Sequence, residues 1–149
     1  LSESNEESWD PYWKRCSSTI NYIGGCYMVF IICAVEGALD FKIDEQQFIN
    51  QLSDNWPVTK LVRWEDLRYP YTIEWTQEIN NVFVEGQLAR TLNAITLEGD
   101  VKDCAEIALW FRRLVPLQTN LLFFDVDYTS SIEVKMNTIL KEITDVNFY

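Results

Sequence analysis

The stretch from Asp100 to Asp127 constrains the fold of this chain more than any other. Between Asp100 and Pro116, apolar residues recur every three or four positions, as on one face of an α-helix. Asp100 is placed to cap the helix N-terminus, and Pro116 has no amide hydrogen with which to continue it. The unbroken apolar run 121–124 follows. A short run without alternation is typical of a strand covered on both faces, so we expect a buried helix and then a central strand.

A second apolar run, Tyr27–Val35, is the most hydrophobic in the chain and rich in β-branched and aromatic residues. This composition predicts another central strand. A helix is expected from Asp44 to the residues before Pro57, because its apolar residues fall on one helical face. Short strands are expected at 61–64 and 71–76, the second with one solvated face.

Asn80 and Asn81 favour a turn, so the residues from Val82 onward should return antiparallel to 71–76. The strand pattern then continues to 97, which suggests one long strand with a bulge at Gly86. The segment Ser130–Glu133 has the spacing of a capping box. It predicts a C-terminal amphipathic helix on Ile132, Met136, Ile139, Ile143 and Val146.

The predicted elements define an α+β fold with a ferredoxin-like β-α-β-β-α-β arrangement. We expect a mostly antiparallel sheet with helices on one face, plus an extra hairpin strand and the C-terminal helix. Residues 22–149 should form a single α+β domain. Residues 1–21 form an acidic and aromatic segment that is expected to be partly disordered. Its residues Tyr12, Trp13 and Ile20 either dock on the domain as a short helix or stay exposed and bind a partner.

The net charge of -11 sets the sign of the protein's long-range field. Such a field repels nucleic-acid phosphates and anionic lipids and attracts basic proteins, although it can also serve solubility alone. The absence of histidine excludes Ser-His-Asp and Cys-His catalytic units. The four cysteines form no CxxC pair, and no apolar run approaches the roughly 20 residues of a membrane-spanning helix. These features predict a reduced cytoplasmic protein without cofactors.

The segment Phe124-Asp125-Val126-Asp127-Tyr128-Thr129 resembles the DxDxT signature of haloacid dehalogenase-like phosphatases. In that family the first aspartate attacks phosphate and the second handles the proton. The resemblance therefore implies Mg²⁺-dependent phosphoryl transfer at Asp125 and Asp127. It covers only these few residues, and residues 130–149 are too short for the α/β domain that follows the motif in that family. The other interpretation is a strand that ends in two solvated carboxylates.

Large aromatic and charged side chains crowd residues 64–75. Trp, Tyr and Arg often anchor protein interfaces, so this segment is the candidate surface for a partner, unless its aromatics pack inward over the sheet edge. The candidate partner-binding residues are Trp64, Glu65, Asp66, Tyr69, Tyr71, Glu74 and Trp75.

The expected function is that of a small, acidic, non-enzymatic domain that binds a basic protein. Its most concrete form is an immunity or inhibitor protein that neutralises a cationic toxin or nuclease. One alternative is the phosphoryl-transfer enzyme centred on Asp125 and Asp127. The other is a regulatory domain that forms homo-oligomers through the hairpin edge or the C-terminal helix.

Overall fold

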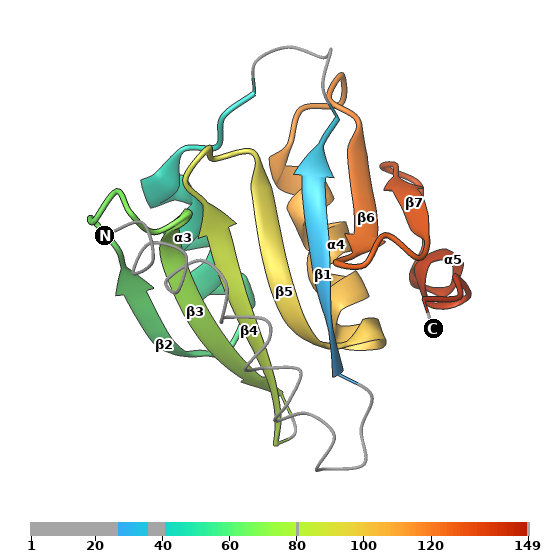
Figure 1. Ribbon diagram of the computed structural model, residues 1–149, viewed down its shortest axis with the longest axis horizontal. Helices are drawn as coiled ribbons and strands as arrows, with labels where there is room; N and C mark the ends of the chain where they lie inside the picture. The colour runs from blue at the N-terminus through green and yellow to red at the C-terminus, as the bar shows by residue number, and fades with distance from the viewer. Residues whose placement is uncertain (1–26, 36–40, 80, 149) are drawn as a thin grey trace.

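The computed structural model describes residues 27–35, 41–79 and 81–148. They form a seven-stranded antiparallel sheet with the strand order β2-β3-β4-β5-β1-β6-β7, and helices α3 and α4 cover one of its faces (Figure 1). The predicted α+β class is therefore confirmed. In chain order the elements are β1 (Tyr27–Ala34), α3 (Glu45–Asn55), β2 (Val58–Arg63), β3 (Tyr71–Ile79), β4 (Val82–Ala89), β5 (Ala94–Asp100), α4 (Val101–Leu114), β6 (Leu121–Asp125), β7 (Ser131–Val134) and α5 (Leu140–Thr144).

The ferredoxin-like strand order is not confirmed. Strands β2 to β5 form a four-stranded meander, and β1 is inserted between β5 and β6. Because β5 and β6 both pair antiparallel with β1, they run in the same direction, and α4 connects them. The β5-α4-β6 segment is thus a split β-α-β unit with β1 in its centre. Sequence periodicity identified these elements but carried no information on which strands pair.

The two long helices begin where the sequence predicts. The side chain of Asp44 accepts a hydrogen bond from the amide of Gln47 at 2.8 Å, and that of Asp100 accepts one from Lys102 at 3.1 Å. Each aspartate thereby satisfies an amide that has no partner within the helix.

The core lies between the helices and the sheet. Phe48 of α3 is fully buried and contacts Trp75 of β3 and Phe111 of α4, with ring centroids 5.5 and 6.3 Å apart. The buried guanidinium of Arg112 closes the far end of α4. It donates hydrogen bonds to the carbonyl oxygens of Val115, Pro116 and Thr119, which ties the helix end to the loop before β6.

Three expectations for individual elements are wrong. The predicted helix from Ser130 onward begins with strand β7, where Ile132 pairs with Phe123 of β6, and only 140–144 are helical. Strand β4 runs through Gly86 without a bulge, and a turn at residues 90–93, with a positive φ at Leu92, separates it from β5. Strand β6 lies next to the edge strand β7 instead of at the centre of the sheet.

Other expectations are confirmed or lie outside the described residues. The turn before β4 has Asn81 in the left-handed conformation, and β3 pairs antiparallel with β4 as predicted. The expectations for segment 1–21 fall outside the described ranges. Within those ranges, no helix has the length and apolar character needed to cross a membrane.

Candidate interaction surface

The candidate surface lies on the sheet face opposite α3 and α4, which we call the helix-free face. Side chains alternate along each strand, so the neighbours of core residues point to this face. Strand register places Glu74 of β3 beside Gln87 of β4, and Gln87 beside Thr96 of β5. These polar residues therefore form one row across the middle strands of the helix-free face.

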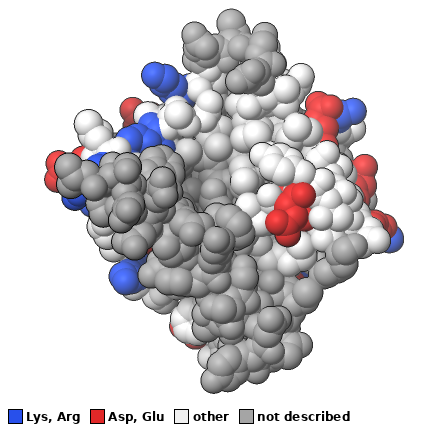
Figure 2. Space-filling view, viewed as in Figure 1, with Lys and Arg blue, Asp and Glu red and all other residues white. Residues whose placement is uncertain are grey.

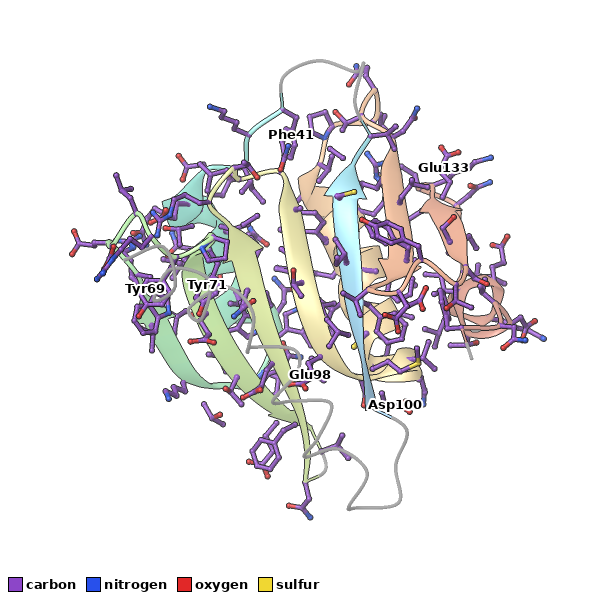
Figure 3. The ribbon with its side chains drawn as sticks, viewed as in Figure 1. Phe41, Tyr69, Tyr71, Glu98, Asp100 and Glu133 are labelled. Atoms are coloured by element: carbon purple, nitrogen blue, oxygen red, sulfur yellow. The ribbon has the colours of Figure 1, made fainter. Side chains whose placement is uncertain are left out.

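Three aromatic side chains gather at one edge of this face, where the β2–β3 connection enters β3. The ring centroids of Trp64 and Tyr69 are 4.5 Å apart, those of Tyr69 and Tyr71 5.8 Å, and those of Trp64 and Tyr71 6.2 Å. Figure 3 shows Tyr69 and Tyr71 close together over the β2–β3 side of the sheet. All three side chains are half-buried. We call this cluster the aromatic corner.

Arg90, which follows β4 directly, holds the backbone of the aromatic corner. Its Nε donates to the carbonyl oxygen of Tyr69 at 2.9 Å. Its Nη2 donates to the carbonyl oxygens of Trp64, Asp66 and Tyr71 at 2.8, 3.0 and 2.9 Å. One partly buried guanidinium therefore fixes the path of the whole connection from β2 to β3. Sequence patterns carry no signal for Arg90, because only the pairing of Tyr71 with Ala89 brings it beneath this loop.

Glu74 fixes the indole ring of the corner. Its Oε1 accepts a hydrogen bond from Trp64 Nε1 at 3.2 Å, and its Oε2 accepts one from Gln87 Nε2 at 3.2 Å. Both donors are neutral, so these two bonds orient the carboxylate without cancelling its charge. A half-buried negative charge therefore lies at the edge of the Trp64 indole ring.

The tip of the β2–β3 connection carries charged and apolar side chains. Arg68 Nη2 lies 2.7 Å from Asp66 Oδ2, and the amide of Arg68 donates to Asp66 Oδ1 at 3.0 Å. These two bonds lower the pKa of Asp66 to about 2. Between this pair, Leu67 is 79% exposed, and Glu65 is exposed as well. No pattern in the sequence marks Leu67, because its exposure results from the turn that Asp66 and Arg68 form.

Trp75 does not belong to this surface. Neighbouring residues of a strand point to opposite faces, so Trp75 points to the helices when Glu74 points away from them. Its side chain is fully buried against Phe48, and its Nε1 donates to Gln77 Oε1 at 3.0 Å. Of the seven predicted partner-binding residues, Trp75 alone lies wholly in the core. The other six lie in or beside the aromatic corner.

Asp125 and Asp127 have different surroundings. Asp125 is buried at the end of β6, and its Oδ1 accepts hydrogen bonds from the amides of Thr129 and Ser130 at 2.8 and 3.2 Å. Asp127 is exposed in the same turn. The carboxylate of Asp125 thus holds the turn that leads into β7. Within residues 27–35, 41–79 and 81–148, no group of three or more acidic, cysteine or histidine side chains is arranged to hold a metal ion.

Charged side chains do not collect into one large patch on the visible part of the helix-free face. Basic and acidic atoms both lie mainly near its outline, with one acidic group in an otherwise uncharged area (Figure 2).

Comparison with protein-family models gave no match, and searches of curated proteins and of solved structures gave none either.

Proposed function

We propose that this chain is a small, acidic, non-enzymatic protein-binding domain, and that the aromatic corner with Leu67 forms its binding surface. The observation that carries the proposal is the rigid presentation of this surface, because Arg90 bonds to four carbonyl oxygens of the loop that bears it. A loop that is ordered before binding loses less conformational entropy in the complex. Trp and Tyr are also enriched among the residues that dominate binding energy.

The partner is proposed to be a basic protein. The net charge of -11 attracts such a partner over long range and speeds its association. At the surface, the carboxylate of Glu74 accepts a hydrogen bond from the indole of Trp64, one of the rings of the aromatic corner. A lysine or arginine side chain placed over these rings would gain both a cation–π and a charge interaction. In its concrete form, the domain is a cytoplasmic immunity or inhibitor protein that occludes a cationic toxin or nuclease.

The test combines crosslinking in cells with measured affinities. A photoreactive amino acid at position 67 should capture a basic protein, whereas the same amino acid at Leu117, which is 70% exposed in the loop before β6, should not. The affinity of the captured partner is then measured with purified variants. Leu67→Ala and Trp64→Ala should each weaken binding by about 2 kcal/mol, roughly thirtyfold, and Leu117→Ala should leave it unchanged.

Three outcomes would contradict the proposal. The first is an acidic captured partner, and the second is an equal loss of affinity in the Leu67 and Leu117 variants. The third is capture of only a second copy of this chain at position 67, together with concentration-dependent sedimentation. That result would support the homo-oligomeric regulatory domain instead.

A further inference from the structure

The carboxylate of Glu74 keeps unused acceptor positions beside the aromatic corner. A carboxylate offers about four lone-pair sites, roughly two on each oxygen. Its Oε1 accepts one hydrogen bond from Trp64 Nε1, and its Oε2 accepts one from Gln87 Nε2. Each oxygen of this half-buried group can therefore accept a second donor.

No cation in the described part of the chain neutralises Glu74. The ion pairs within residues 27–35, 41–79 and 81–148 join Arg63 to Glu45, Arg68 to Asp66, and Lys141 to Asp145. The guanidinium of Arg90 bonds the carbonyl oxygens of the neighbouring loop through Nε and Nη2. A half-buried charge interacts more strongly with an added cation than a fully solvated charge does, because water screens it less.

The two hydrogen bonds also fix the direction in which the carboxylate points. The Nε1–H of Trp64 lies in the plane of the indole, so Glu74 Oε1 is held at the edge of that ring. The bond from Gln87 to Oε2 restrains rotation of the carboxylate. The ring of Tyr69 lies 4.5 Å from that of Trp64, and Arg90 holds the Tyr69 backbone. An oriented carboxylate thus lies beside two ordered aromatic rings.

We propose that this site binds an arginine side chain of the basic partner, with the guanidinium stacked against the Trp64–Tyr69 ring pair and bonded to both oxygens of Glu74. A guanidinium is planar, stacks on aromatic rings and presents its donors in a rigid fork that matches a carboxylate. A lysine ammonium is a compact, strongly hydrated point charge without that fork. The inference rests on the proposed function, because it names the partner group that the binding surface recognises.

NMR titration of the ¹⁵N-labelled full chain with two small probes tests the preference for arginine. The probes are Nα-acetyl-arginine methylamide and Nα-acetyl-lysine methylamide. The readout is the indole Nε1–H resonance of Trp64, which is assigned by its loss in Trp64→Phe. The arginine probe should shift this resonance and saturate it in the millimolar range, and the lysine probe should bind about tenfold more weakly.

Variants of Glu74 separate the forked contact from general charge. Glu74→Gln should weaken binding of the arginine probe about tenfold and remove the difference between the probes. Glu74→Asp keeps the charge but withdraws it by one methylene group, so it should also remove the difference, and it serves if Glu74→Gln loses the folded spectrum. The matched control is Glu78→Gln, which removes the same charge further along β3 and should leave both affinities unchanged.

Three results would overturn the arginine contact. They are equal binding of the two probes by the unmodified chain, a Trp64 resonance that the arginine probe does not move, and undiminished arginine binding in folded Glu74 variants. A basic protein captured at position 67, together with any of these results, would reject the arginine contact and leave the proposed function standing. Selective binding of the arginine probe without any captured basic protein would support the contact and reject the proposed function.

Discussion

The indole ring of Trp75 lies directly over Gly86 on the neighbouring strand. The two residues are register partners in the β3–β4 pair, and a β-carbon built on Gly86 would lie 2.2 Å from Trp75 Cζ2. The ring fits beneath Phe48 and against the sheet only because position 86 has no side chain. Gly86 is therefore needed for packing and does not form the bulge that the sequence pattern suggests.

Gly86→Ala should destabilise the protein by about 1–3 kcal/mol, the usual cost of an overpacked core, because the indole ring would have to move. Urea unfolding followed by circular dichroism measures the change. Gly99→Ala is the matched control, since a β-carbon there would meet Val84 Cγ2 at 3.1 Å and Cys104 Sγ at 3.5 Å. Equal losses of stability in the two variants would contradict a specific role for the Trp75–Gly86 contact.

Arg90→Lys should loosen the aromatic corner while the sheet stays folded. An ammonium group cannot reach all four carbonyl oxygens that the planar guanidinium bonds, and hydrogen bonds to charged groups contribute about 1.5–3 kcal/mol each. Hydrogen exchange should quicken in residues 64–71 and stay unchanged in β5. Arg68→Lys is the control, because Arg68 bonds Asp66 at the exposed loop tip. If hydrogen exchange quickens equally in Arg68→Lys, the order of the loop does not depend specifically on the hydrogen bonds of Arg90.

The two long helices were predictable from the sequence and the contacts that build the aromatic corner were not, for physical reasons. Asp44 and Asp100 cap helices through bonds to residues two or three positions away, so local sequence contains the whole signal. Arg90 and Trp64 are joined across 26 positions, and their contact depends on strand register. Periodicity does not encode that register.

The same limit explains the error at the C-terminus. Ile132 fits a helical pattern with later residues and also a strand pattern with Val134. Both residues pair with β6, and this pairing favours the strand over the helix. The helical pattern could not reveal the pairing, because it is local to the sequence.

The ionisation of Asp66 should persist to unusually low pH. Side-chain hydrogen bonds from Arg68, and then the bond from its amide, lower the pKa of Asp66 from 3.8 to about 2. A lowered folded-state pKa stabilises the fold at pH values above the unfolded pKa, and that contribution is lost as pH falls from 3.8 toward 2. Because the pair is solvent-exposed, the effect on stability should be small and salt-sensitive. Carboxyl ¹³C chemical shifts measure the titration directly.

In Arg68→Gln, the pKa of Asp66 should rise toward 3.8, although the amide bond of residue 68 keeps it somewhat lower. An unchanged titration in this variant would show that Arg68 is not the cause of the low pKa.

Cys104 should make the fold less stable at alkaline pH. Burial, followed by the nearby charges of Asp103 and Asp100, raises the pKa of its thiol well above 9.0. The unfolded chain loses this proton above its ordinary pKa and the folded chain does not, so stability falls by up to about 1.4 kcal/mol per pH unit. Unfolding in urea at pH 8 and pH 10 measures the decline. Cys104→Ala should show a shallower decline, and an equal decline would assign the alkaline sensitivity to other groups.

Asp125→Ala should destabilise the turn before β7 through loss of the bonds to the amides of Thr129 and Ser130. Leaving such groups without partners costs about 1–3 kcal/mol. Asp127→Ala should change stability by less than about 0.5 kcal/mol, because that side chain is exposed. Thermal unfolding with and without about 10 mM Mg²⁺ separates this structural role from ion binding. The melting temperature of the unmodified chain could instead rise with Mg²⁺, with no such rise in either variant. That result would favour ion binding for phosphoryl transfer over a purely structural role of Asp125 in the turn.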